Sequence, residues 1–349
     1  MYKFVTKLYI QKFMLKKLLQ YGVPLIISIG LCYLLFTGID FNEMIETIRN
    51  ECNFAWIGLA LFISLFSHVF RAMRWRIQLR ALDINPPLLP LVYSIFGTYA
   101  VNLVFPRLGE VWRTTYVAQR QNASFTAVFG SMVADRLADT VTVLFITLLA
   151  FLLASGAISQ YLAQNTELYT KLLSLIASPW LWLAIVAMIA AMWWVFTKKR
   201  DNKLIAKIID FARGLWIGFA AIAKMKGKGQ WLLLTVAIWG CYFVQMFVAF
   251  FAFKETTAVI ENHGVVAVLV CFALSSIAMG VPSNGGIGPW QWSVIFGLSI
   301  YGMAIDGISV AFANLVLGSQ TLLLIILGIY TFAAIALEKR RTSNLPTQR

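Results

Sequence analysis

Acidic residues, histidine and cysteine are all scarce in this chain of 349 residues. It contains 15 Asp and Glu, 2 His and 4 Cys, and only 13% of its residues are charged. The histidines, His68 and His263, form no cluster, and the cysteines have neither the spacing of a metal site nor that of a disulfide framework. We therefore expect no metal site and no cofactor, and we expect the cysteines to behave as small hydrophobic residues.

Hydrophobic residues are abundant instead. They make up 60% of the chain, and the mean hydropathy of +0.77 lies far above that of soluble domains. A membrane-spanning helix needs about 20 mainly apolar residues, so the composition predicts an integral membrane protein built as an all-α, polytopic helix bundle. Apolar runs lie at about 21–38, 54–70, 88–105, 125–154, 180–196, 231–253, 265–281, 290–303 and 308–336.

Positive charges give the chain a net charge of +14 and cluster beside the apolar runs. This placement follows the positive-inside rule of membrane proteins rather than the pattern of nucleic-acid binding. Residues 1–20 alternate lysines with hydrophobic residues, either as an amphipathic segment on an anionic leaflet or as a topology signal alone. We expect a retained first helix at 21–38, cytoplasmic termini including the tail 338–349, and a bacterial inner membrane.

The basic loop 198–228 determines the expected topology of the first half. It carries nine Lys or Arg against two Asp, so it belongs in the cytoplasm. That orientation requires 88–105 and 107–122 to enter and leave on the same side, as a re-entrant hairpin that turns near Pro106. Segment 107–122 is too polar to face lipid, but it is suited to line a cavity inside the protein.

The second half repeats this arrangement. Because basic residues follow the run 308–336, that helix must end in the cytoplasm, and 265–281 with 290–303 must form a second hairpin turning at Pro282–Pro289. The membrane domain 21–337 then has two halves, 21–154 and 180–337, each with three spans and one hairpin. An odd number of spans makes the halves an inverted repeat. Eight full crossings, with both hairpins spanning, would leave the other loops on the same sides.

Charged residues within or beside the first hairpin suggest a binding site. Arg107, Glu110 and Arg113 have i,i+3 spacing and predict ion pairs on one helix, near Asn102. Arginine suits bidentate phosphate binding, so the cluster is either a lipid phosphate site or an ion network that secures the hairpin. Asp135-Arg136-x-x-Asp139 lies inside the run 125–154.

Intramembrane carboxylates usually face a cavity or a partner charge. We expect Asp135 and Asp139 either to balance Arg107 and Arg113 or to relay protons. Interhelical ion pairing is the structural alternative to proton coupling, and it fits these residues at least as well.

Two further motifs contribute to the expected site. The turn with Asn284, Gly285, Gly286, Gly288 and Gln291 cannot continue a helix, and its freed backbone N–H groups suit an anion.

Arg71, Arg74 and Arg76 follow the run 54–70. They are expected either to contact lipid headgroups or, more simply, to anchor the helix at the cytoplasmic surface.

Together, these motifs resemble the transmembrane domain of lysylphosphatidylglycerol synthases and its stand-alone relatives, which are known as uncharacterised membrane proteins. The resemblance covers roughly 20–337 and rests on Arg71-Ala-Met-Arg-Trp-Arg76, Asn102 with Pro106-Arg107-x-Gly109-Glu110-x-x-Arg113, Asp135-Arg136, and Pro282 with Gly285-Gly286-Ile-Gly288. The resemblance implies that, in family members fused to a second domain, this membrane domain moves aminoacylated phospholipid between leaflets. The second domain of those members transfers the amino acid. Since the chain ends at Arg349, we expect no aminoacyltransferase activity. The family often has Glu where this chain has Gln291.

The interpretation we favour is a membrane lipid translocase, similar to a flippase, that binds an anionic headgroup between the two hairpins. No nucleotide-binding motif is present in the sequence, so an ion gradient or the lipid gradient would drive it. The alternative is a membrane-embedded transferase acting on a polyprenyl-phosphate or phospholipid, with Asp135 and Asp139 as catalytic candidates. Expected partners are membrane phospholipid or a lipid-linked substrate and no nucleic acid; a homo-oligomer is left open.

Overall fold

The described part of the protein, in this computed structural model, covers residues 41–105, 107–197, 220, 225–281, 283, 285–305 and 307–343. The expected segment 1–20, the first helix 21–38, most of the basic loop 198–228, Asn284 and the end of the tail lie outside the described residues. All regular secondary structure within them is helical. The prediction of an all-α membrane helix bundle is confirmed.

Four described helices are long and apolar enough to cross a membrane, or five if α12 and α13, bent by 112° at their junction, count as one span. They match the expected runs 54–70, 125–154, 231–253 and 308–336. Large apolar side chains on α6, such as Leu148 and Phe151, are more than half exposed, which suits a surface in contact with lipid. The four are α3 (Phe54–Arg80), α6 (Phe125–Leu153), α11 (Lys228–Ala249, continued by the 3₁₀ turn η1, Phe250–Ala252) and α15 (Gly307–Ser343).

Two pairs of shorter helices form the hairpins. The first joins α4 (Leu88–Val104) to α5 (Leu108–Arg120), and the second joins α13 (Val265–Ala278) to α14 (Pro289–Ile300). The four helices have 17, 13, 14 and 12 residues, each fewer than the roughly 20 needed for a span. The helix breaks occur where the sequence predicts them, because both connections contain residues that stop a helix.

Glycine brings the two arms of the first hairpin together. A side chain at Gly109 would collide with the carbonyl oxygen of Thr98 and lie 2.7 Å from Oδ1 of Asn102. The start of α5 therefore packs directly on the backbone of α4. Trp112 covers Gly97 on the same hairpin, and a side chain there would collide with the indole ring.

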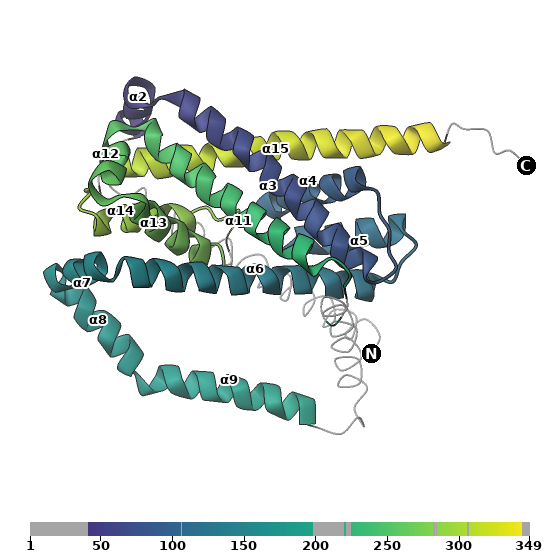
Figure 1. Ribbon diagram of the computed structural model, residues 1–349, viewed down its shortest axis with the longest axis horizontal. Coiled ribbons are helices and arrows are strands. Elements are labelled where there is room, and N and C mark those ends of the chain that lie inside the picture. Colours follow the sequence, from purple (N-terminus) through teal and green to yellow (C-terminus); the bar gives the residue numbers. More distant parts are fainter. Residues whose placement is uncertain are drawn as a thin grey trace, which may run out of the picture.

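The long helices pack crosswise on the hairpins. Helices α3 and α11 lie along each other, as Figure 1 shows. Helix α6, which follows the first hairpin in sequence, packs on α13 of the second, while α15, which follows the second hairpin, packs on α4 of the first. Each hairpin is therefore held partly by the helix that follows the other one.

The remaining helices lie at the edges of the bundle. In Figure 1, α8 and α9 run apart from it, whereas α2 and α12 lie at the end opposite α5. These edge helices are α2 (Phe41–Glu51), α7 (Ser155–Gln164), α8 (Thr166–Ala177), α9 (Pro179–Thr197) and α12 (Lys254–His263).

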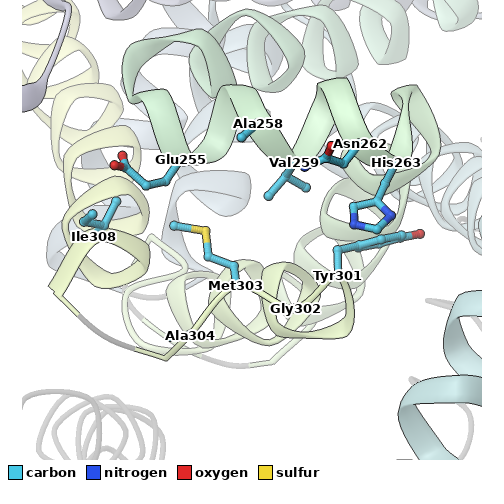
Figure 2. Close-up of a pocket in the computed structure, with 10 residues that line it drawn as sticks. All are labelled: Glu255, Ala258, Val259, Asn262, His263, Tyr301, Gly302, Met303, Ala304 and Ile308. Atoms are coloured by element: carbon cyan, nitrogen blue, oxygen red, sulfur yellow. The ribbon is translucent and has the colours of Figure 1, made fainter.

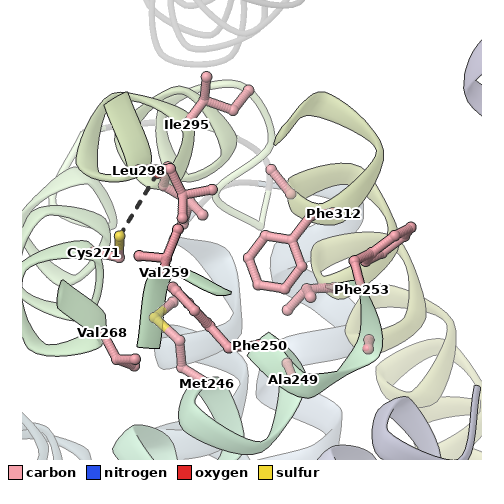
Figure 3. Close-up of a cluster of buried hydrophobic side chains, with 14 of the residues drawn as sticks. Met246, Ala249, Phe250, Phe253, Val259, Val268, Cys271, Ile295, Leu298 and Phe312 are labelled. Atoms are coloured by element: carbon pink, nitrogen blue, oxygen red, sulfur yellow. Dashed lines mark hydrogen bonds between the residues drawn. The ribbon is translucent and has the colours of Figure 1, made fainter. Parts of the chain in front are cut away.

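Two buried clusters divide the core of the bundle. The larger lies at the α12 end, where Phe250 meets Phe312 edge to face with ring centroids 5.1 Å apart (Figure 3). The second gathers around the fully buried Trp75 between α3, α4, α5 and α6. The guanidinium of Arg113 lies over Trp75 of this second cluster, so the cluster forms part of the surroundings of the candidate site.

Candidate functional site

Two arginines of α3 and two aspartates of α6 form a buried ion network. Arg74 lies 2.7 Å from Asp135 and 2.8 Å from Asp139, and Arg71 lies 2.5 Å from Asp139. Arg71 and Arg74 are one helical turn apart, as are the two aspartates, so each pair shares one face of its helix. All four are at most 8% exposed. The network is formally neutral and joins α3 to α6.

This pairing corrects two expectations. The structure does not place Asp135 or Asp139 in an ion pair with Arg107 or Arg113, and it holds Arg71 and Arg74 inside the protein. The reason is that α3 continues to Arg80, well past the end of its apolar run, so these arginines face α6 before the helix ends.

Arg76 is the exception among the three arginines expected at the cytoplasmic surface. It is half-buried and donates from Nε to the carbonyl oxygen of Pro86 at 2.9 Å, which secures the connection into α4.

Glu110 is held by residues outside the expected triplet. Its carboxylate lies 3.1 Å from Arg136 and accepts hydrogen bonds from Nδ2 of Asn102 at 3.3 Å. Oδ1 of Asn102 accepts from the backbone N–H of Gly109 at 2.8 Å, which secures the start of α5. The expected Arg107–Glu110 pair is absent among the described residues, because α5 begins only at Leu108. Arg107 precedes it with φ of 67°. The expected Glu110–Arg113 pair is also absent from the described part of the chain, although both residues lie in α5, because Glu110 pairs with Arg136 and Arg113 lies over Trp75.

Arg113 is the unusual charge of the site. Its side chain is fully buried, yet Nε, Nη1 and Nη2 have no hydrogen-bond partner among the described residues. Its guanidinium carbon lies 4.3 Å from the ring centroid of Trp75, a cation–π contact that stabilises a buried charge by only about 2 kcal/mol. A buried cation that lacks hydrogen bonds is strongly unfavourable. Arg113 is therefore a buried side chain whose hydrogen-bond donors are unsatisfied by the described residues.

Arg107 links the tips of the two hairpins. Its Nη2 donates to the carbonyl oxygen of Gly280 at 3.0 Å, and the side chain is otherwise exposed. Gly285 has φ of 64°, and a side chain there would lie 2.7 Å from Cδ2 of Leu103 on α4. The glycine-rich turn of the second hairpin thus contacts the end of α4, and the two expected halves of the site meet.

In the second hairpin, Gln291 links the start of α14 to α15 through hydrogen bonds of its side chain. Its Oε1 accepts from the backbone N–H of Gly288 at 2.7 Å, and its Nε2 donates to Oδ1 of Asn314 at 2.7 Å. It caps α14 and connects it to α15. The N–H of Gly288, which the sequence offers to an anion, is therefore already occupied. Gly286 has positive φ and packs against Met279.

Several residues of the site were missed by sequence analysis. Trp75 covers Arg113, while Tyr242 and Thr235 of α11 accept hydrogen bonds from Arg71 and Arg74 at 3.4 and 3.3 Å. On α3, polar residues at helical spacing begin within the apolar run, and this pattern indicates a buried polar face. No comparable pattern in the sequence marks Thr235 and Tyr242 of α11. No group of three His, Cys, Asp or Glu side chains able to hold a metal converges in the described ranges.

Further polar atoms around the ion network lack partners. Both ring nitrogens of His68 and both side-chain polar atoms of Gln78 are buried without a hydrogen bond among the described residues. Both residues lie on α3, as do Arg71, Arg74 and Trp75. The inner face of this helix therefore carries polar atoms that the described residues leave without hydrogen-bond partners.

Comparison with known proteins agrees with these motifs. Residues 23–336 match the family described as the lysylphosphatidylglycerol synthase TM region. A UPF0104 membrane protein of Pyrococcus horikoshii is 22% identical over 282 residues, covering 76% of this chain and 82% of that protein. No solved structure matches significantly. The family match spans the two hairpins and the buried ion network, and the chain therefore belongs to the lysylphosphatidylglycerol synthase transmembrane-region family.

Proposed function

We propose that this protein is a lipid translocase that binds an anionic headgroup at Arg107 and Arg113, between its two hairpins. The observation that carries the proposal is Arg113, which is fully buried and has no hydrogen-bond partner among the described residues. A phosphate would supply the acceptors and the negative charge that its guanidinium lacks.

The charge distribution supports an anionic ligand. Two arginines balance Asp135 and Asp139 in the buried network, and Arg136 balances Glu110. Arg107 and Arg113 remain as the surplus positive charges of the cluster. Since the other charges neutralise one another, an arriving phosphate would be attracted to these two side chains.

The positions of the two arginines suggest a path for the headgroup. Arg107 is exposed at the hairpin tip just before α5, whereas Arg113 is buried within α5, about 7.5 Å along the helix from its first residue, at 1.5 Å per residue. A headgroup would first meet Arg107 and would reach Arg113 once α5 separates from α3. Trp75 fills that boundary and would have to move.

An inverted repeat would give such a path two openings, one on each side of the membrane. The crosswise packing of α6 on α13 and of α15 on α4 supports this arrangement, because each hairpin is held by the helix that follows the other. Rocking of one half against the other would then expose the site alternately. The basic residues beside α3 and α15 favour a cytoplasmic orientation for those helix ends, in a bacterial inner membrane.

The transferase alternative gains no support from the geometry. Asp135 and Asp139, its catalytic candidates, are both held by Arg74, with Asp139 also 2.5 Å from Arg71. Both carboxylates are thus engaged in joining α3 to α6.

Headgroup selectivity in vesicles tests the proposed function. The purified protein would be reconstituted, and transbilayer movement of labelled phosphatidylglycerol and labelled phosphatidylcholine would be followed with a membrane-impermeant quencher. We expect faster movement of phosphatidylglycerol and a marked slowing in Arg107→Gln. Arg120→Gln is the matched control, since Arg120 lies on the same helix but pairs at the surface with Glu338. Rates equal to those of protein-free vesicles would overturn the proposal.

A further inference from the structure

A pocket of about 320 Å³ lies between α12 and the connection from α14 to α15. Figure 2 shows it bounded by Glu255, Val259 and His263 of α12 on one side and by Tyr301 and Met303 on the other. Helix α12 lies at the opposite end of the bundle from α5, the helix that carries Arg113 (Figure 1). The pocket therefore belongs neither to the ion network nor to the hairpin tips.

Glu255 gives the pocket its charge. It is the only acidic residue in the lining, which contains no Lys or Arg. Its Oε2 is buried and accepts no hydrogen bond from the described residues, and no described Lys or Arg forms an ion pair with it. A buried carboxylate oxygen without a donor is unfavourable. The ligand that would satisfy it is a hydrogen-bonding cation.

The rest of the pocket is mainly apolar and elongated. Glu255 lies at one end, above Ile308, while His263 and Tyr301 form the other end with ring centroids 5.1 Å apart (Figure 2). His263 follows Glu255 by eight positions in α12, which corresponds to about 12 Å along the helix. Val259 and Met303 line the space between the two ends (Figure 2).

We infer that this pocket binds a primary aliphatic amine, with its ammonium group against Glu255 and its chain along Val259 and Met303. The ammonium supplies the donors that Oε2 lacks. The aliphatic chain buries its methylene groups on apolar side chains, and the rings of His263 and Tyr301 close the far end. This site is opposite in charge to the one proposed at Arg113, and it stands or falls independently of lipid translocation.

Isothermal titration calorimetry on the purified full-length protein tests this inference, with pentylammonium and propylammonium as probes. Pentylammonium should bind more tightly than propylammonium by roughly fourfold for each added methylene. Glu255→Gln should weaken binding of both probes by roughly tenfold or more, because it removes the negative charge. Glu261→Gln is the matched control, since Glu261 lies on the same helix but is exposed and does not line the pocket.

A second variant tests the contact between Met303 and the aliphatic chain of the amine. Met303→Ala should reduce the difference between the two probes while leaving propylammonium binding nearly unchanged. If Glu255→Gln and Glu261→Gln bind both amines as the unmodified protein does, the observed heat comes from detergent partitioning, and the inference is wrong. Absence of binding by the unmodified protein would overturn it as well.

The source of the amine is a separate question that vesicles answer. Pentylammonium affinity would be compared in vesicles of phosphatidylglycerol alone and in vesicles that also contain phosphatidylethanolamine. Weaker apparent binding in the second case, absent in Glu255→Gln, would identify a lipid ammonium headgroup as a competitor. Equal binding would assign the pocket to a soluble amine. Either result requires that the pocket recognises an ammonium group.

Discussion

The guanidinium of Arg113 stacks on the indole of Trp75, with 4.3 Å between its central carbon and the ring centroid. Neither residue is exposed, and the guanidinium nitrogens make no hydrogen bond to the described part of the protein. A residue retained only for stability would not leave a buried cation in this condition, because an apolar side chain of similar volume would pack there more favourably. The proposed binding of a headgroup at Arg113 would supply the acceptors that this buried guanidinium lacks.

Replacing Arg113 should abolish lipid movement without lowering the stability of the protein. Arg113→Met removes a buried charge without hydrogen bonds and keeps most of the side-chain volume, so we predict equal or greater stability, by up to about 2 kcal/mol. Thermal unfolding of the purified protein in detergent measures this effect. A loss of more than about 2 kcal/mol would mean that Arg113 is a structural partner of the network.

Removing one partner of the buried Arg74–Asp135 ion pair should destabilise the protein, whereas removing Arg113 should not. Asp135→Leu leaves Arg74 with less negative charge around it, and we predict a loss of about 3 kcal/mol. The double variant Arg74→Met with Asp135→Leu should recover most of that loss, since Asp139 keeps its contact with Arg71. Denaturation midpoints of the two single variants and the double variant check the coupling. Additive losses would show that the residues do not act as a pair.

Helices α4 and α5 approach each other so closely at Gly109 that no side chain should be tolerated there. Gly109→Ala places a methyl group against the carbonyl of Thr98, and we predict a destabilisation of about 1–3 kcal/mol with loss of the Asn102 contact. Gly240→Ala is the comparison, because nothing lies within 4 Å of that position in α11, and Ala there should be neutral or stabilising. Equal unfolding temperatures for both variants would contradict the packing of α5 on α4.

The sequence predicts the hairpins because their breaks have a local cause. Pro and Gly stop a helix wherever it lies, so the ends of α4 and α13 could be located from neighbouring residues alone. The apolar runs likewise depend on composition, and four of them correspond to long helices of the structure. Loop charges further predict that each hairpin begins and ends on the same side of the membrane, which the re-entrant arrangement and the eight-crossing arrangement both satisfy.

The ion partners could not be predicted, because they depend on which helix faces which. Asp135 and Asp139 share a face of α6, and sequence correctly places them together, but only the packing of α3 on α6 brings Arg74 within 2.8 Å of Asp139. The local prediction for Arg107 and Glu110 failed for a different reason. Helical spacing applies only inside a helix, and Arg107 lies before α5 in a left-handed conformation.

The most direct measurement of the central claim is the rate of transbilayer phosphatidylglycerol movement in vesicles containing Arg113→Lys or Arg113→Met protein. Circular dichroism and reconstitution yield must first show that both variants are folded. We predict that Arg113→Met abolishes movement, while Arg113→Lys, which keeps the charge but loses the bidentate geometry, retains a reduced rate. If folded Arg113→Met protein moved phosphatidylglycerol as fast as the unmodified protein, Arg113 would not bind the headgroup, and the account would be wrong.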